Sequence, residues 1–196
     1  AVFMIVQDEK KTLHPLATIF IKQCYETLID VAQQSGGKLP YRTNFILDEF
    51  ANLPPIVDMD NIITASRSRN IRMYLVIQGM KQLNSAYGDN VADIIKGNCD
   101  YWYYMMSKEL SLLKEISELC GTKQNDEDVI VMNSVPLISV SELQRLNIGE
   151  VLVMQKRLSP YMANLLDINE YNFFEMDSAD EPSFESKKMP DIFLMS

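Results

Sequence analysis

The sequence contains very little histidine and cysteine. His14 is the only histidine, and Cys24, Cys99 and Cys120 lie far apart without a C-x-x-C pair. A catalytic triad would depend on that one histidine, and a site built from several histidines is excluded. Three scattered cysteines predict neither a disulfide framework nor a zinc site. Reduced cysteines, as in a cytoplasmic protein, are the interpretation that fits this pattern.

Long hydrophobic runs are absent as well. No stretch approaches the ~18 consecutive apolar residues that a membrane span requires, and no secretory signal pattern is present. We therefore expect this chain by itself to be soluble and cytoplasmic. It begins with Ala1 inside an apolar run that is typical of a strand. We expect from this that the chain is a piece of a longer protein.

Positive charge is scarce. The net charge is −9, and −6 of it lies from Asp167 onward, where eight acidic residues face only Lys187 and Lys188. The remaining body is almost balanced, so bulk charge does not favour direct DNA binding by this chain. Residues 172–196 are acidic and contain Pro182 and several serines. This composition predicts a disordered tail after a folded body of residues 1–171.

Short apolar runs alternate with helical patterns along the body. Five runs are typical of strands, namely residues 2–6, 44–47, 73–77, 101–106 and 151–155. Strands alternating with helices predict an α/β fold with a mainly parallel sheet of about five strands. Because these runs are apolar throughout, we expect helices to cover both faces of the sheet, in three layers.

Four helices are predicted between the strands. The first spans about residues 12–34, with one apolar face formed by Leu16, Ile19, Phe20, Cys24, Leu28 and Val31. The others span about residues 54–69, 108–119 and a segment beginning near Ser139. Ser139 and Glu142 have the spacing of a capping box. Residues 123–134 are polar and acidic, which predicts a loop or an arm.

Polar side chains follow two of the predicted strands directly. Asp48 and Glu49 come after one strand, and Gln78 follows the next, thirty residues later. Ligands of open α/β sheets bind at the carboxyl ends of the strands, so these are the candidate site residues. An apolar strand that ends in Asp-Glu is the Walker B pattern. Asp48 would hold Mg²⁺, Glu49 would orient or deprotonate water, and Gln78 would hold that water or sense the γ-phosphate.

Structural alternatives exist for each of these residues. Asp48 could cap a turn, and Glu49 could be merely solvated. Arg67, which lies near the end of the intervening helix, could act as an arginine finger, which is worth about 10³–10⁵ in rate. It could equally belong to a solvated helix end that the helix dipole favours.

The phosphate-binding sequence G-x-x-x-x-G-K-[ST] is absent. The only Gly-Lys pair is Gly37-Lys38, which Leu39 follows. Without that loop no nest of backbone N–H groups and no lysine can hold the phosphates. We therefore expect this chain alone not to hydrolyse ATP.

Several segments resemble the coupling proteins of type IV secretion systems, the TraG/TraD family of conjugative DNA-transfer ATPases. TNFILDEFANL (residues 43–53) is similar to the family's Walker B segment, and SRSRNI (66–71) to its arginine motif. QGMKQL (78–83), IIKGNC (94–99) and ISELCG (116–121) continue the pattern in the same order. The similarity covers about residues 1–168. One departure is Gly79, where the family usually has a polar residue, and we expect this change to matter little.

The resemblance implies a fold, a site and partners. Residues 1–171 would be the C-terminal part of a RecA-like nucleotide-binding domain that acts with ATP and Mg²⁺ in the intact protein. Asp48 would be the Mg²⁺ ligand, Glu49 the catalytic acid, Gln78 the sensor and Arg67 the finger acting on a neighbouring subunit. The intact protein would form a homo-hexamer at the cytoplasmic face of the cell membrane, anchored by N-terminal helices. It would pass relaxase–DNA complexes of the relaxosome to the proteins of a secretion channel.

Two other functions remain open from the sequence. The chain could be a non-enzymatic docking module that binds an adaptor of the DNA-processing complex. It could also be an unrelated α/β enzyme whose metal is bound by Asp48 and Glu49. Mg²⁺ binding without nucleotide would distinguish that last case.

Overall fold

The computed structural model of this chain describes residues 1–6, 11–124 and 134–171. The chain divides into a larger unit, residues 1–165, and a smaller one, residues 166–196. In the smaller unit, the described residues contain one turn of 3-10 helix, η4 (Ile168–Glu170). The expected disorder of residues 172–196 concerns residues outside the described ranges and stays a prediction.

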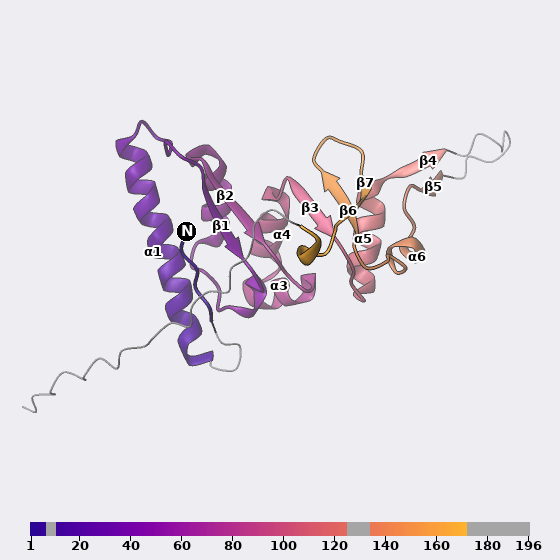
Figure 1. Cartoon of the computed structure of the whole chain (residues 1–196), viewed down its shortest axis with the longest axis horizontal. Helices are drawn as coiled ribbons and strands as arrows, with labels where there is room; N and C mark the ends of the chain where they lie inside the picture. The colour runs from indigo at the N-terminus through magenta and orange to yellow at the C-terminus, as the bar shows by residue number, and fades with distance from the viewer. Residues whose placement is uncertain (7–10, 125–133, 172–196) are drawn as a thin grey trace, which may run out of the picture. The chain divides into compact units, whose positions relative to one another are not determined.

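The N-terminal part of the larger unit is built on two parallel strands. The 3-10 helix η1 (Lys11–Leu13) leads into α1 (His14–Gln34), and β1 (Thr43–Leu47) follows. After η2 (Phe50–Asn52), α2 (Met59–Ser66) and η3 (Arg67–Arg69), the chain enters β2 (Ile71–Leu75). β2 pairs with β1 in parallel, from Thr43 opposite Ile71 to Leu47 opposite Leu75 (Figure 1). This is the βαβ unit that the sequence predicts.

The β1–β2 pair has one covered and one open face. Exposure alternates along both strands, so Phe45, Leu47, Ile71 and Met73 face the core. On the other face Ile46 is 72% exposed and Tyr74 43% exposed. The prediction that helices cover both faces of the sheet is therefore wrong for these strands within the described chain. Continuous apolar sequence does not reveal whether a second layer is present.

α1 has the predicted length, but its buried face differs from the predicted one. The residues that contact the core are Ile21, Tyr25 and Ala32, whereas Leu16 and Ile19 are more than half exposed. Both sets recur at helical spacing, because α1 carries apolar residues around much of its circumference. Of the predicted face, Leu28 packs against the core, whereas Leu16, Ile19, Phe20 and Val31 are exposed.

The C-terminal part of the larger unit contains an antiparallel sheet. Two helices, α3 (Met80–Tyr87) and α4 (Asp89–Asn98), precede β3 (Tyr101–Tyr104), and α5 (Leu110–Cys120) follows it. The chain then forms α6 (Val140–Leu143), β6 (Glu150–Gln155) and β7 (Tyr161–Asn164). β6 pairs antiparallel with both β3 and β7.

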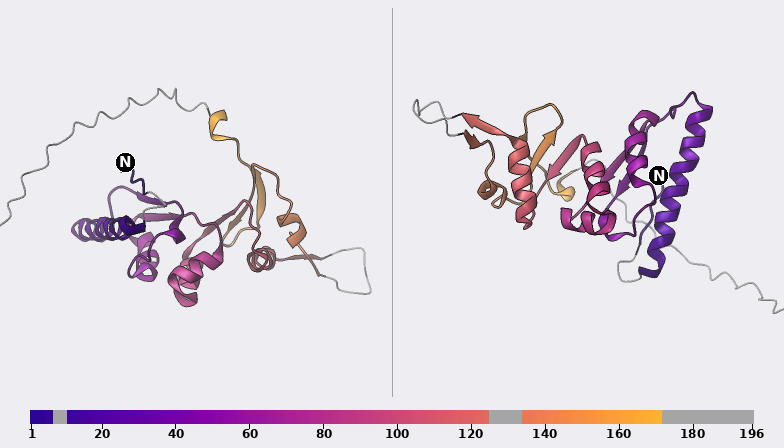
Figure 2. Two further views of the ribbon diagram at one scale, coloured as in Figure 1. Left: turned by 90° about the horizontal axis from the view of Figure 1, so that it is seen from below. Right: turned by 180° about the vertical axis from the view of Figure 1, so that it is seen from behind.

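A second core lies between this sheet and α5. Its fully buried members include Leu113, Leu143 and Leu152. The predicted capping box starts α6: the Glu142 backbone N–H donates to Ser139 Oγ at 3.2 Å, and Ser139 N–H donates to the Glu142 carboxylate at 2.6 Å. α3 and α4 lie between the β1–β2 pair and α5 in every view (Figures 1 and 2).

Residues 123–134 were expected to form a loop or an arm. Two short strands, β4 (Thr122–Gln124) and β5 (Ser134–Pro136), pair antiparallel at the base of this segment. The residues that connect them, 125–133, lie outside the described part of the chain.

The chain has a mixed α/β fold, but the expected mainly parallel sheet of about five strands is not formed. Within the described residues the parallel part is β1 and β2 alone, and the other two sheets are antiparallel. Residues 2–6 were predicted as a strand, yet they have no strand structure and are largely exposed. β6 pairs antiparallel with β3, although α5 lies in the connection between the two strands. β7 was missed, although a turn at Lys156-Arg157 and then Ser159-Pro160 separate it from β6.

No helix among the described residues is both long enough and apolar enough to cross a membrane. The three cysteines are all free.

Candidate functional site

The candidate site lies at the shared carboxyl end of β1 and β2. Backbone hydrogen bonds continue past the strand ends, from Val76 N–H to the Leu47 carbonyl at 3.0 Å and from Phe50 N–H to the Val76 carbonyl at 2.9 Å. These bonds hold the segment after β1 against the segment after β2. The residues that follow each strand are therefore brought together, as the strand order predicts.

Asp48 and Glu49 form a sharp turn directly after β1. The Glu49 backbone N–H donates to Asp48 Oδ1 at 3.0 Å. Glu49 has φ 48° and ψ 39°, a left-handed conformation that non-glycine residues rarely adopt. Such strained residues persist where the surrounding contacts fix them, and they are frequent at functional sites.

Two amide groups hold the Glu49 carboxylate. Gln78 Nε2 donates to Glu49 Oε1 at 3.1 Å, and Asn52 Nδ2 donates to Glu49 Oε2 at 2.9 Å. The predicted pair Glu49 and Gln78 is thus in direct contact, across the two parallel strands. Asn52 was not predicted as a site residue. Its position three residues after Glu49, in a turn, is the signal that could have identified it.

The loop after Glu49 is anchored by aromatic packing. Phe50 is fully buried, and its ring stacks on that of Tyr87 with centroids 5.2 Å apart. The Tyr87 hydroxyl oxygen accepts a hydrogen bond from Ile56 N–H at 3.1 Å. Burial raises the pKa of Tyr87 to about 12, against a smaller opposing effect of the hydrogen bond from Ile56. The site loop is therefore held between β2 and α3.

Arg67 lies away from the two carboxylates. It precedes β2, so it is at the amino end of the sheet, whereas Asp48 and Glu49 follow the carboxyl end of β1. Five strand residues span about 16 Å, which separates the two edges. The Arg67 side chain is 86% exposed, and its guanidinium pairs with Asp100 at 3.1 Å. Within one chain, the structure does not bring Arg67 to Glu49.

The neighbouring Arg69 has a structural contact instead. Its guanidinium donates to the Gly37 carbonyl at 2.8 Å, which ties the loop after α1 to η3. It also borders a hollow of about 390 Å³ between α1 and α2. None of the predicted site residues lines this hollow.

The carboxylate oxygens of Asp48 and Glu49 have the chemistry of ligands for a divalent metal ion. Asp48 is exposed and Glu49 half-buried, and their oxygens are the kind of ligand that Mg²⁺ prefers. In the part of the chain that the structure describes, no three metal-binding side chains of the His, Cys, Asp or Glu type gather at one point. Two carboxylates alone hold a divalent ion weakly, so phosphate oxygens or water would have to complete the coordination.

Comparison with known proteins identifies relatives of this chain. Residues 42–147 match the family described as the TraM recognition site of TraD and TraG. No curated protein sequence matches the chain. The matched range contains β1, β2, the candidate site and all of α3, α4 and α5.

Solved structures of a bacterial conjugative coupling protein, TrwB, share the fold. An unbound form with 15% identity matches 79% of this chain and 37% of its own length, with a TM-score of 0.66. A form in complex with sulphate, also 15% identical, covers 82% and 39% with a TM-score of 0.69. TrwB in complex with ADP and Mg²⁺, again 15% identical, covers 80% and 38% with a TM-score of 0.63. This chain thus spans less than two fifths of the structures it matches.

Proposed function

This chain belongs to the TraG/TraD family, and from that premise we propose that it supplies the acidic half of the ATP site of a conjugative coupling protein. The observation that carries the proposal is the contact between Glu49 and Gln78 at the shared end of two parallel strands. TrwB, whose fold is similar, has been solved with an ATP analogue and with ADP and Mg²⁺. ATP and Mg²⁺ are therefore the proposed cofactors of the intact protein.

Each site residue has a distinct proposed role. Asp48, being exposed, would hold Mg²⁺ directly or through water. Glu49 would orient the attacking water and accept its proton, since its carboxylate is already fixed by amides from Gln78 and Asn52. Gln78 donates to Glu49 and could instead donate to the γ-phosphate, which would make it a sensor of the bound nucleotide. The bound Mg²⁺ would neutralise charge on the phosphates.

A phosphate-binding segment has to complete this site. The sequence contains no phosphate-binding loop, and carboxylates alone repel ATP. Ile46, Tyr74 and Val76 are exposed on the open face of the β1–β2 pair. Asp48 comes directly after β1. We propose that further parts of a RecA-like domain cover this apolar face in the intact protein and bring the phosphate-binding loop to Asp48.

Arg67 fits a role in a neighbouring subunit. It is highly exposed and lies at the opposite edge of the sheet from Glu49. A residue in that position can reach an ATP site only on another copy of the protein. The proposed homo-hexamer, with one arginine finger per interface, satisfies this requirement.

The biological role follows from the family as a proposal. The intact protein would recruit relaxase–DNA complexes of the relaxosome and drive their transfer through a type IV secretion channel. Helices outside this chain would anchor it at the cytoplasmic face of the cell membrane.

The test uses a coupling protein that contains this chain together with its phosphate-binding loop. Glu49→Gln should bind ATP and lose turnover, while Asp48→Asn should lose the Mg²⁺ dependence of binding. ATP hydrolysis and the binding of a fluorescent ATP analogue, with and without Mg²⁺, measure the two effects. Glu118→Gln, an exposed change on α5, is the matched control and should keep full activity. Full turnover in both site variants would refute the proposed roles.

A second candidate function is the docking of a relaxosome adaptor. The family description of residues 42–147 as a TraM recognition site favours it. The 196-residue chain would then bind a TraM-type protein in the absence of nucleotide. A binding titration of the chain, with and without residues 172–196, tests this and shows whether the acidic tail takes part. No binding by either form would count against docking.

A further inference from the structure

The short connection between β2 and α3 joins the candidate site to the C-terminal part of the molecule. Gln78 and Gly79 lie in this connection, and α3 begins at Met80. Gln78 contacts Glu49 through its side chain, so the position of its backbone decides whether that contact can form. The first turn of α3 in turn depends on a residue from a distant part of the chain.

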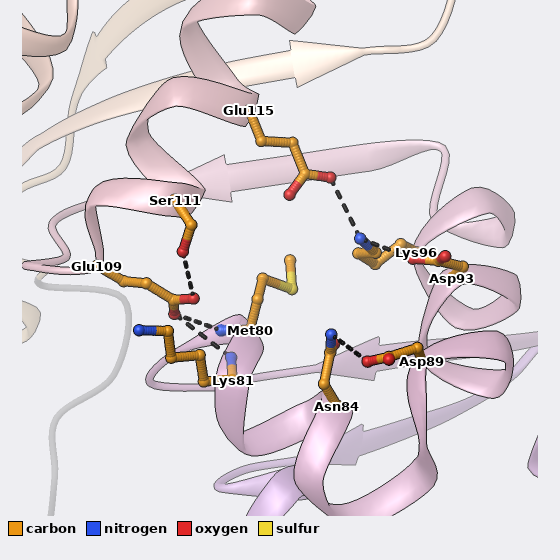
Figure 3. Close-up of polar contacts among 9 residues, drawn as sticks. All are labelled: Met80, Lys81, Asn84, Asp89, Asp93, Lys96, Glu109, Ser111 and Glu115. Carbon is orange, nitrogen blue, oxygen red and sulfur yellow. Dashed lines mark hydrogen bonds and ion pairs between the residues drawn. The ribbon is translucent and has the colours of Figure 1, made fainter.

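That residue is Glu109, which precedes α5 (Figure 3). Glu109 Oε2 accepts hydrogen bonds from the backbone N–H groups of Met80 at 3.0 Å and Lys81 at 3.4 Å. These N–H groups have no partner within the helix, and a carboxylate is favoured there by the helix dipole. Glu109 thus caps α3 from outside the helix.

The Glu109 side chain is itself held in place. Ser111 Oγ donates to Glu109 Oε1 at 2.9 Å (Figure 3). The Glu109 backbone N–H donates to Ser107 Oγ at 3.1 Å. Both of its carboxylate oxygens are therefore bonded. A carboxylate fixed in this way sets the position of the helix end that it contacts.

Gly79 makes the approach possible. A Cβ atom at residue 79 would lie 3.0 Å from Glu109 Oε2, closer than ordinary van der Waals contact. The backbone of Gly79 is extended, with φ −170°, so a larger residue here would meet the Glu109 carboxylate but no backbone strain. A glycine at this position leaves room for the Glu109 carboxylate, whereas the prediction that the change matters little stays untested.

We propose that Glu109 is a positioning residue for Gln78, and that it couples the Glu49–Gln78 pair to α5 and the antiparallel sheet. Glu109 fixes the backbone at Met80, two residues after Gln78, and Gln78 contacts Glu49. A change in the contacts of Glu49 therefore alters the position of α5, and a change in the position of α5 alters the contacts of Glu49, because coupling between two sites is reciprocal. The effect on ATP turnover rests on the proposed function, but the coupling within the chain does not.

A second polar link joins α4 to α5 and provides a control. Lys96 pairs with Asp93 at 2.9 Å and with Glu115 at 3.2 Å (Figure 3). This link connects α4 to α5, but it does not involve the segment next to Gln78. Breaking it loosens the contact between α4 and α5 and leaves the contact between Glu109 and α3 in place.

The first experiment uses the 196-residue chain without nucleotide. Side-chain and backbone amide signals of Gln78, Met80 and Lys81 are followed by ¹H–¹⁵N NMR and hydrogen exchange in Glu109→Ala and Glu109→Gln. We expect the Gln78 side-chain signal to shift in Glu109→Ala, and the amides of Met80 and Lys81 to exchange about tenfold faster. Glu109→Gln keeps an acceptor oxygen, so we expect a smaller shift of the Gln78 signal and a smaller increase in the exchange of the Met80 and Lys81 amides than in Glu109→Ala.

The controls decide between positioning and simple stabilisation. Glu115→Gln should leave the Gln78 signal in place. The proposal is overturned when the Gln78 signal stays unchanged in Glu109→Ala, or when Glu115→Gln shifts it as far. Gly79→Ala is a further variant that displaces the Glu109 carboxylate and should reproduce the shift if Glu109→Ala does not fold.

The second experiment separates this proposal from the proposed function. In the intact coupling protein, Glu109→Gln should lower kcat for ATP with little change in KM, because the carboxylate does not touch nucleotide. If the Gln78 NMR signal shifts in the variant chain but the unmodified intact protein has no ATP turnover, the proposed function is refuted and the coupling between Glu109 and Gln78 stands. If the unmodified intact protein hydrolyses ATP and both Glu109→Gln and Glu109→Ala have the same kcat as that protein, the positioning role alone is refuted.

Discussion

The hydroxyl of Tyr87 offers a sharp test of how the site loop is held. Tyr87 ends α3, stacks on Phe50 and accepts a hydrogen bond from Ile56 N–H at 3.1 Å. Ile56 is 3% exposed, so its N–H group has little access to water when the hydroxyl is removed. Tyr87→Phe keeps the aromatic ring and deletes only this acceptor.

The expected loss of stability follows from that one contact. An unsatisfied buried N–H group costs about 1–3 kcal/mol. For a chain of this size, each kcal/mol lowers Tm by about 2–4 °C. We therefore expect Tyr87→Phe to lower Tm by about 2–12 °C, with the slope of urea denaturation unchanged because the same surface is exposed on unfolding.

The same residue predicts a dependence on alkaline pH. Burial raises the pKa of Tyr87 from 10.0 to about 12 in the folded chain. Below pH 10 the hydroxyl is protonated in the folded and the unfolded state, and its contribution to the free energy of unfolding is complete. Between pH 10 and 12 the unfolded chain loses the proton first, so the folded state loses stability. The difference in unfolding free energy between the unmodified chain and Tyr87→Phe should narrow over this range.

Urea denaturation followed by circular dichroism, at pH 7 and again between pH 10 and 12, measures both effects. Tyr103→Phe is the matched control, because Tyr103 is 60% exposed and should be insensitive to the change. Equal denaturation midpoints for Tyr87→Phe and the unmodified chain at pH 7 would show that the hydroxyl does not hold the loop.

Three other perturbations test the C-terminal part. Leu113→Ala, at a fully buried position of α5, should destabilise the fold by about 2–5 kcal/mol, whereas Leu119→Ala, 61% exposed on the same helix, should have little effect in thermal denaturation. Gly149→Ala should lower Tm, since φ is 90° and a Cβ would lie 2.9 Å from a carbonyl oxygen just after β7; an unchanged Tm would contradict this geometry. Hydrogen bonds from the backbone and hydroxyl of Ser139 lower the pKa of Glu142, so the capping box is intact above pH 4.5 and opens as the pH falls through the folded-state pKa. An NMR titration of Glu142 with a midpoint at or above 4.5 would be inconsistent with that cap.

Much of the candidate site was determined by the sequence. Asp48-Glu49 and Gln78 follow two predicted strands about one βαβ unit apart, so the sequence predicted that they could be neighbours, and the structure has Glu49 and Gln78 in contact. Four of the five predicted strands and the four predicted helices are present because their patterns are local, whereas α3 and α4 were not predicted. The capping box at Ser139 is likewise a local feature that the spacing of two residues specifies.

Sequence patterns could not decide which strands pair. Apolar runs specify that a strand forms, but hydrogen bonding between distant strands depends on how the connecting segments turn. β3 therefore pairs antiparallel with β6, and β1 pairs with β2 alone. The buried face of α1 was undecided for a related reason, because a helix that is apolar on two sides is oriented only by its neighbours.

The contacts that hold the site across the chain came only from the tertiary structure. Glu109 is one of many charged residues in the sequence, and nothing in its spacing from Met80 indicates a bond between them. Local residues and their order determined what the candidate site is made of. Folding of distant segments decided what supports it, because a capping carboxylate and an aromatic stack act through space and not along the chain.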